Sequence, residues 1–250
     1  MPAAGRAASA SRTPDVTSSD TRTTDAADVS TPGDLYRGAR GEDYFARQAA
    51  AGTRAASMNM FVWAPYVGPS DAVVEFGCGA GDLLAVLPGA RKAGVEINPA
   101  AVARARARGL DVHESLTTLP SAAFSRAVSS HALEHVDSPA AVLRELRRVL
   151  RADGELLLLL PLDDWREGGQ RRFRPGDFDM HLYAWTPLTL GNLLVAAGFA
   201  PREVRVIDHA WPPRVAERLW RASPGLFHLG ARLTSVLMKK RQLFARATPA

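Results

Sequence analysis

The stretch of sequence that decides the fold is VVEFGCGAGD, residues 73–82. Its apolar half, residues 73–76, is typical of a buried strand, and a helix is predicted to begin at Asp82. Between them stand Gly77, Gly79 and Gly81, which let the backbone turn sharply and let a ligand approach without meeting a Cβ. The free N–H groups at the start of the helix can receive an anion or a carboxylate. The stretch therefore predicts a strand–turn–helix unit with a ligand site at the turn.

The glycine spacing and the acid before it argue against a pyrophosphate ligand. Dinucleotide-binding turns read G-x-G-x-x-G, and their helix end carries the phosphates. Here the glycines read G-x-G-x-G, and Glu75 stands two residues before the first of them. A carboxylate at this place repels pyrophosphate and attracts a cationic amine. An NAD-dependent oxidoreductase is therefore the weaker interpretation.

A second carboxylate follows the next predicted strand. The segment GVEIN, residues 94–98, places Glu96 at the carboxyl end of that strand, about 20 residues past the first turn. A carboxylate there can accept hydrogen bonds from both hydroxyls of a ribose. The alternative is a solvated acid at a strand end. The distance from the glycine-rich turn favours the ribose contact.

Strands and helices alternate through the rest of the chain, which predicts a mostly parallel sheet with helices on both faces. The predicted strands are 72–76, 93–97, 110–113, 127–130, 156–160, 204–207 and a final edge strand at 242–247. The predicted helices are 82–87, 99–108, one from 139 that stops at 153–154, 187–197, and a stretch at 214–237 broken at 224–225.

Segments on either side of this core complete the predicted organisation. Residues 1–33 carry almost no large apolar side chains, which predicts a disordered tail. Residues 34–250 form one domain: a helical segment at 35–66, a cofactor-binding core at 71–210, and a helical insertion with the edge strand at 211–250. The apolar residues of 35–66 either pack on the domain or form a lid over a substrate pocket.

Composition narrows the partners and the compartment. Cys78 is the one cysteine of the chain, so an intramolecular disulfide is excluded and a reducing cytoplasm is expected. No apolar run approaches the roughly 20 residues of a membrane helix, so no membrane partner is expected. The formal net charge is +5, but arginines are spread over ordinary helix faces. A small-molecule partner is therefore favoured over nucleic acid.

Three segments together resemble a known family. They are VVEFGCGAGDLLAVL (73–87), GVEIN (94–98) and SSHALEHVDSPAAVLRELRRVLRADGELLLLLP (129–161). In this order they look like the class I S-adenosylmethionine-dependent methyltransferases, closest to the small-molecule enzymes, over residues 71–210. The resemblance implies an α/β, Rossmann-like, seven-stranded sheet with an antiparallel final strand, and S-adenosylmethionine as cofactor. It does not specify the acceptor; a sugar, a glycan-linked intermediate or a secondary metabolite is the first expectation.

The resemblance also implies roles for individual residues. The methionine part of the cofactor is expected on Glu75, Gly77, Gly79 and Gly81, with Cys78 in the same loop, and the ribose is expected on Glu96. The adenine is expected beside Ile97 and Asn98. The family's usual acid after the third strand is replaced by Ser115, so Glu114 is the expected substitute for its adenine contact. Cys78 itself is interpreted as a small side chain that packs, not as a nucleophile.

Two histidines are the candidate general bases. His131 follows the fourth strand, at the edge of the sheet where α/β folds bind ligands, and His181 lies in a polar and aromatic stretch after the fifth strand. Residues 131–135 read H-x-x-E-H, a pattern of some zinc enzymes, but the family resemblance explains it as the loop after the strand, so no metal is expected. Arginines at 171, 172 and 174 belong to a solvated loop or meet an acidic substrate.

Three other functions remain open to the sequence. Nucleic-acid methyltransferases that modify amines resemble one another in an Asn/Asp-Pro-Pro-aromatic motif after the fourth strand. Residues 130–133 read SHAL instead, which argues against this class of enzyme. A protein that has kept the cofactor fold without catalysis is disfavoured by the intact motifs. The oxidoreductase is disfavoured by the glycine spacing.

Overall fold

A computed structural model describes residues 36–49, 52–162, 181–213 and 215–250. The expected disordered tail at 1–33 and the arginines at 171, 172 and 174 lie outside the described residues. The polar and aromatic stretch after the fifth strand, which the sequence places at residues 177–185, is described from His181 onward.

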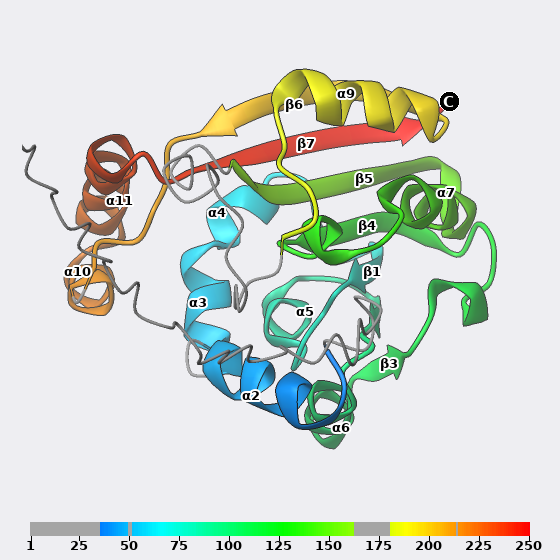
Figure 1. Cartoon of the computed structure of the whole chain (residues 1–250), viewed down its shortest axis with the longest axis horizontal. Helices are drawn as coiled ribbons and strands as arrows, with labels where there is room; N and C mark the ends of the chain where they lie inside the picture. The colour runs from blue at the N-terminus through cyan, green and yellow to red at the C-terminus, as the bar shows by residue number, and fades with distance from the viewer. Residues whose placement is uncertain (1–35, 50–51, 163–180, 214) are drawn as a thin grey trace, which may run out of the picture.

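A seven-stranded sheet in the order β3-β2-β1-β4-β5-β7-β6 forms the centre of the molecule (Figure 1). The strands are β1 Ala72–Phe76, β2 Arg91–Val95, β3 Asp111–His113, β4 Phe124–Ser130, β5 Leu150–Leu162, β6 Phe199–Ile207 and β7 Arg241–Pro249. The β1–β2, β1–β4, β2–β3 and β4–β5 pairs are parallel, whereas β7 pairs antiparallel with both β5 and β6. The predicted fold class and the antiparallel final strand are confirmed.

The prediction that the final strand lies at the edge of the sheet is wrong. β7 lies between β5 and β6, and the edge strand is β6. The residues of β7 explain its place: Leu243, Phe244, Ala245 and Ala247 are fully buried, so both faces of the strand are covered. β6 is covered less completely, with only its two terminal residues buried, which suits an edge.

Two layers of helices cover the sheet. On one face, α7 (Pro139–Val149) and α9 (Pro187–Ala196) bury leucines such as Leu146 and Leu190 in one cluster with residues of β4, β5, β6 and β7. On the other, α4 (Met60–Trp63) and α5 (Asp82–Val86) pack Trp63 and Leu83 against the alternate residues of the same strands. β5 is buried on both faces, as its run of leucines predicts. α6 (Pro99–Ala107) lies beside β3.

One helix ends earlier than the sequence predicts. α7 was expected to run to residues 153–154, but it ends at Val149, and β5 begins at Leu150. Leu150 is buried and pairs with Phe124 of β4 across a register shift, so the connection is already part of the sheet.

The terminal segments lie at the carboxyl ends of the parallel strands (Figure 1). The N-terminal one folds as α2 (Gly38–Ala49), α3 (Gly52–Met58) and α4, in agreement with the predicted helical segment. The C-terminal one folds as α10 (Ala216–Ala222) and α11 (Pro224–Met238), and the predicted break falls at Ser223, which caps α11. Among the described residues, no helix has the length and apolar character needed to cross a membrane.

Candidate functional site

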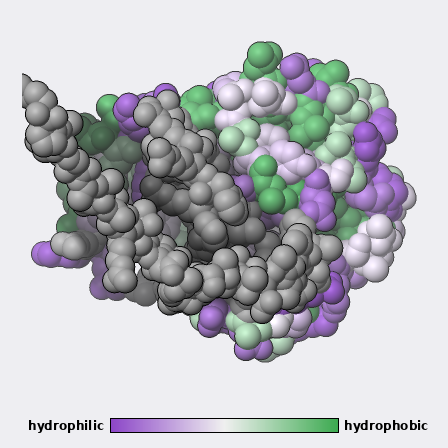
Figure 2. Space-filling model, in the orientation of Figure 1, coloured by the Kyte–Doolittle hydropathy of each residue, from purple (hydrophilic) through white to green (hydrophobic). Residues whose placement is uncertain are grey.

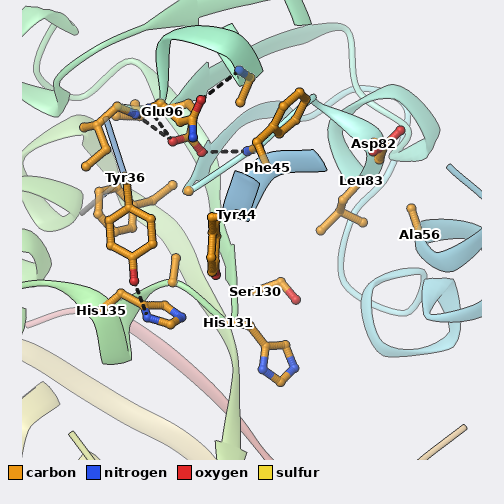
Figure 3. A pocket seen from close by; sticks show the side chains of 18 of the residues that line it. Tyr36, Tyr44, Phe45, Ala56, Asp82, Leu83, Glu96, Ser130, His131 and His135 are labelled. Carbon is orange, nitrogen blue, oxygen red and sulfur yellow. Dashed lines mark hydrogen bonds between the residues drawn. The ribbon is translucent and has the colours of Figure 1, made fainter. Parts of the chain in front are cut away.

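A cavity of about 550 Å³ opens at the carboxyl ends of β1, β2 and β4 (Figure 3). This is the place where open α/β sheets bind their ligands. Three groups of residues line it. They are the glycine-rich loop with Gly77 and Gly79, the segment after β2 with Glu96, Ile97 and Asn98, and the N-terminal helices with Tyr36, Tyr44, Phe45, Ala56 and Trp63.

The glycine-rich loop is hydrogen-bonded to the end of β2 and exposes its backbone to the cavity. The backbone N–H groups of Gly77 and Cys78 both donate to the carbonyl of Val95, which ties the loop to the end of β2. Gly77 has a φ of +71°, and a Cβ there would lie 2.4 Å from the Cβ of Ala132. Gly79 has a φ of +53° and no atom within 4 Å of its Cβ position. The loop thus presents bare backbone to the cavity at Gly79, as the sequence predicts.

Other predicted residues of this loop point away from the cavity. Gly94 leaves room for Cys78, because a Cβ at residue 94 would lie 2.5 Å from the Cys78 sulfur. Burial raises the pKa of the Cys78 thiol, which keeps it protonated and supports its interpretation as a packing residue. Gly81 is needed because a Cβ there would meet Leu110. None of Cys78, Gly81 and Glu75 is part of the cavity lining.

Glu75 is a buried acid beneath the loop. It is 3% exposed, and burial raises the pKa of its carboxyl well above the usual range. A hydrogen bond from the backbone of Leu84 opposes this shift, and the charges of Glu96 and Asp82 reinforce it. Such a carboxyl ionises at the cost of desolvation, unless a cation comes to it. Its predicted role toward the cofactor amine stays a prediction.

Glu96 closes the loop onto the segment that follows β2. Its Oε1 accepts the backbone N–H groups of Ile97 and Asn98, and its Oε2 accepts that of Gly79, each at 2.8 Å (Figure 3). A carboxylate offers about four acceptor positions. Backbone N–H groups occupy three of these positions on Glu96 and thereby fix the floor of the cavity. One acceptor position remains for a further hydrogen-bond donor.

Asn98 joins the cavity floor to the N-terminal segment. Its side-chain oxygen caps α6 by accepting from Ala100 and Ala101, and its side-chain nitrogen donates to the carbonyl of Gly41 in α2 at 2.8 Å. α2 in turn carries Tyr44 to the cavity wall, where it packs edge-on against Tyr36. The N-terminal segment therefore lines the cavity, as the lid interpretation requires.

A second cavity of about 360 Å³ adjoins the first. The two share Tyr44, Asn59, His131 and His135 in their linings. The second extends toward the loop after β6 and the start of β7, which contribute His209, Trp211, Lys240, Arg241 and Gln242. His131, predicted from the sequence, lies where the two cavities meet, whereas His181 lines only the second.

His131 is held in an uncommon conformation. Its φ is +52°, in the left-handed region that non-glycine residues rarely adopt, and backbone strain of this kind is enriched at active sites. Its backbone N–H donates to the carbonyl of Leu159, and its Nε2 lies 3.0 Å from Oε1 of Gln242. These contacts turn the imidazole toward the cavities (Figure 3).

The H-x-x-E-H segment gathers three imidazoles around one carboxylate. Glu134 is fully buried, and its Oε1 lies 3.7 Å from Nδ1 of His131 and 3.8 Å from Nε2 of His135. The ring of His181 packs on that of His135 with 4.9 Å between centroids, because Leu182 donates its backbone N–H to the carbonyl of Glu134. Ligand atoms of Glu134, His135 and His181 lie within 4.8 Å of one another.

Two predicted cofactor residues lie apart from both cavities. Glu114 is exposed after β3, and Ser115 uses its hydroxyl to cap the short 3₁₀ turn Leu116–Thr118. Conversely, the sequence reasoning missed Tyr36 and Gln242 as site residues. Tyr36 is bonded through its hydroxyl to Nδ1 of His135 at 2.7 Å, and no local pattern announces that contact. Gln242 was detectable in principle, because the first residues of an antiparallel final strand must reach the carboxyl edge of the parallel ones.

Comparisons with known proteins agree with this architecture. A family model described as "Methyltransferase domain" matches residues 45–204. The chain is similar to a structure from Thermotoga maritima described as a possible histamine N-methyltransferase, with a TM-score of 0.58, 21% identity, and 84% of this chain and 96% of that one covered. A comparison with curated proteins found no match.

Two further solved structures have the same fold. A SAM-dependent methyltransferase from Archaeoglobus fulgidus has a TM-score of 0.59 and 16% identity, over 83% of this chain and 99% of that one. A geranyl diphosphate C-methyltransferase from Streptomyces coelicolor A3(2), solved with Mg²⁺, geranyl diphosphate and S-adenosyl-L-homocysteine, has a TM-score of 0.55 and 15% identity, over 84% of this chain and 82% of that one. At these identities the likeness concerns the fold.

Proposed function

The chain belongs to the family of S-adenosylmethionine-dependent class I methyltransferases, and from this premise we propose that it methylates a hydroxyl or amine of a small-molecule acceptor. S-Adenosylmethionine is the cofactor. The acceptor classes to be tried first are sugars, glycan-linked intermediates and secondary metabolites. The single cysteine favours a cytoplasmic site of action.

The residues of the larger cavity fit this cofactor. Bare backbone at Gly79 allows close approach of a bulky ligand, and Glu96 beside it offers an acceptor position to a ribose hydroxyl. Ile97 and Asn98 complete the wall on which the adenine would lie. When bound, the cofactor supplies an electrophilic methyl group on a sulfonium whose thioether is a good leaving group.

One observation carries the proposal: His131 lies at the junction of the two cavities. The larger cavity takes the cofactor, and the smaller one, lined by polar and aromatic side chains, takes the acceptor. In this arrangement the chain acts mainly by holding the acceptor in line and excluding water, and alignment of this kind supplies roughly 7–11 kcal/mol of the barrier. The aromatic side chains of Tyr36 and Tyr44 cover the cofactor side.

His131 is proposed to accept the proton of the acceptor. Its Nε2 faces the Gln242 amide oxygen and is therefore the protonated nitrogen, so Nδ1 is the atom that takes the proton. The imidazolium that results would be stabilised by Glu134, whose Oε1 lies 3.7 Å from Nδ1. His181, on the far side of His135, is the second candidate base and lines the acceptor cavity.

Calorimetric titration of the purified protein tests the cofactor part of the proposal first. We expect micromolar affinity for S-adenosylmethionine and for S-adenosylhomocysteine, and no heat with NAD. Acceptor classes are then screened by transfer of a labelled methyl group. NAD binding without binding of either sulfur compound would contradict the proposal, and cofactor binding without transfer to any small molecule would favour RNA as the acceptor or a non-catalytic protein.

A further inference from the structure

α11 exposes an apolar face. Six of its side chains are between 43% and 82% exposed: Leu226, Leu229, Leu233, Val236, Leu237 and Met238. The first five recur at helical spacing along one side, whereas Phe227, Ala231 and Ser235 on the other side are buried. In Figure 2, hydrophobic residues gather over this helix at the left of the view. A contiguous exposed face of this kind marks an interaction surface.

The same helical hairpin carries several cationic side chains. Arg218 and Arg221 of α10, Arg232 of α11 and Lys239 after it are all exposed. Glu217 is the acidic residue within α10 and α11, and its carboxylate bonds to Arg221 at 2.6 Å. The α10–α11 hairpin, residues 216–239, therefore combines a net positive charge with an apolar helix face.

We propose that the apolar face of α11 binds the surface of an anionic lipid bilayer. An amphipathic helix with leucines on one side and basic residues around them lies in the interface, with its apolar side in the acyl boundary and its charges among the headgroups. Each basic residue near an anionic surface adds attraction. The lack of a long apolar run in the sequence argues against a membrane partner that is spanned by a helix, but a helix that lies on the surface requires no such run.

Charge favours lipid over a second copy of the chain as the occupant. Two copies that met through α11 in a symmetric contact would bring the same basic residues of both hairpins together. Such a contact places like charges opposite one another, which opposes association. An anionic bilayer matches both the leucines and the arginines.

The α10–α11 hairpin is connected directly to the walls of the smaller cavity. The chain enters the hairpin just after Trp211 and leaves it just before Arg241, and both residues line the smaller cavity. α10 and α11 lie beyond the carboxyl ends of the parallel strands (Figure 1), and the smaller cavity is lined by residues that follow those ends, such as His131. Docking of α11 would therefore place the cavity close to the bilayer. This surface binding stands independently of the proposed methyl transfer.

Co-sedimentation of the full chain with lipid vesicles tests the proposal. One set is neutral phosphatidylcholine, and the other contains phosphatidylcholine and phosphatidylglycerol in equal parts. We expect at least about tenfold tighter binding to the anionic vesicles, weakened by salt. In Leu233→Asp/Leu237→Asp, two exposed positions of the face, the anionic-vesicle binding should be lost.

The matched control is Leu188→Asp/Val195→Asp on α9, whose side chains are 72% and 61% exposed and which adds the same charge elsewhere. It should bind vesicles like the wild type. Thermal unfolding checks that each variant is folded. If the α11 double variant does not fold, the single variant Leu237→Asp replaces it, because Leu237 is 82% exposed. The proposal is overturned if the wild type ignores anionic vesicles, if both double variants lose binding equally, or if sedimentation shows wild-type dimers that the α11 variant dissociates.

Discussion

The amide of Gln242 determines which nitrogen of His131 carries the proton. The Gln242 side-chain nitrogen donates to the carbonyl of His209 at 2.8 Å, which leaves its oxygen toward Nε2 of His131 at 3.0 Å. An amide oxygen only accepts, so Nε2 must donate. The two residues are 111 positions apart in the sequence and meet because β7 runs antiparallel to β5. Gln242 is therefore a positioning residue for the proposed base.

Replacement of Gln242 by glutamate should move the pH dependence of the reaction. In Gln242→Glu a carboxylate faces Nε2 and stabilises the protonated imidazole, whereas the base acts in its neutral form. The acid limb of the profile of kcat/KM against pH should therefore shift to higher pH, by about one unit. The affinity for S-adenosylmethionine, measured by calorimetry, should stay within about threefold.

The variant Gln242→Leu tests the hydrogen bond to His131 without introducing a charge. The leucine removes the hydrogen-bond acceptor of Nε2 and adds no charge. We therefore expect kcat to fall by about tenfold, while the acid limb of the pH profile stays near its wild-type position. Identical pH profiles in the wild type and Gln242→Glu would show that Gln242 has no influence on the reacting base.

The two candidate bases should differ in their effect on turnover. His131→Asn is expected to lower kcat by about 10²–10⁴-fold, the usual contribution of a general base, with cofactor affinity retained. His181→Asn should lower it less, because His181 lines only the smaller cavity. His113→Asn, a histidine at the end of β3 that bonds Thr118, is the matched control and should leave kcat unchanged. Full turnover in the His131/His181 double variant would contradict base catalysis by either.

Most of the fold could be predicted because local sequence patterns determine it. The glycine-rich turn, the alternation of strands and helices and the leucine run of β5 each depend on neighbouring residues, and the described elements follow them closely. The place of β7 within the sheet was not predictable in this way. A strand that follows a separate helical segment looks like an edge until the covering of both its faces by distant segments is known.

The site was predictable only as far as it lies in those turns. Glu96 and His131 follow strands directly, so position in the strand was enough to place them at the cavity. Tyr36 and Gln242 come from segments whose packing is decided by tertiary contacts. The H-x-x-E-H pattern points to His135 only as a metal ligand, whereas the structure places this residue against Tyr36 in the wall of both cavities.

Removal of the Glu96 carboxylate should weaken cofactor binding. Glu96→Ala loses both the acceptor for the ribose and three bonds that hold Gly79, Ile97 and Asn98 in place. Hydrogen bonds to charged groups contribute about 1.5–3 kcal/mol, so affinity for S-adenosylmethionine should fall roughly 10–100-fold. Glu217→Ala, at an exposed position of α10, is the control and should bind normally. Equal affinity in all three proteins would show that the cofactor lies elsewhere.

Metal removal should leave activity unchanged. Tetrahedral zinc with bonds of about 2.0–2.1 Å holds its ligand atoms roughly 3.3 Å apart. Those of Glu134, His135 and His181 are spread over up to 4.8 Å, and the carboxylate already faces His131 and His135. Turnover after exhaustive dialysis against a chelator should therefore equal that before it. Stoichiometric metal in the purified protein, with activity restored by that metal alone, would contradict this expectation.

Acid should destabilise the fold through His209. This residue packs against Phe61 and Phe227, and burial, with the nearby His228, lowers the pKa of its imidazole to about 4. In the unfolded chain a histidine titrates near 6.5, so between the two values the unfolded state binds more protons than the folded one. The stability from neutral His209 is therefore complete above about pH 6.5 and lost as pH falls toward 4, to a total of about 3 kcal/mol.

Urea unfolding of the wild type and His209→Phe at several pH values measures this contribution, because other titrations cancel in the difference. Phenylalanine suits the aromatic surroundings and does not titrate. The wild type should lose stability relative to the variant between pH 6.5 and 4, with a constant difference above that range. A difference between the wild type and His209→Phe that is independent of pH would mean that folding leaves the pKa of His209 unchanged, which would contradict the prediction.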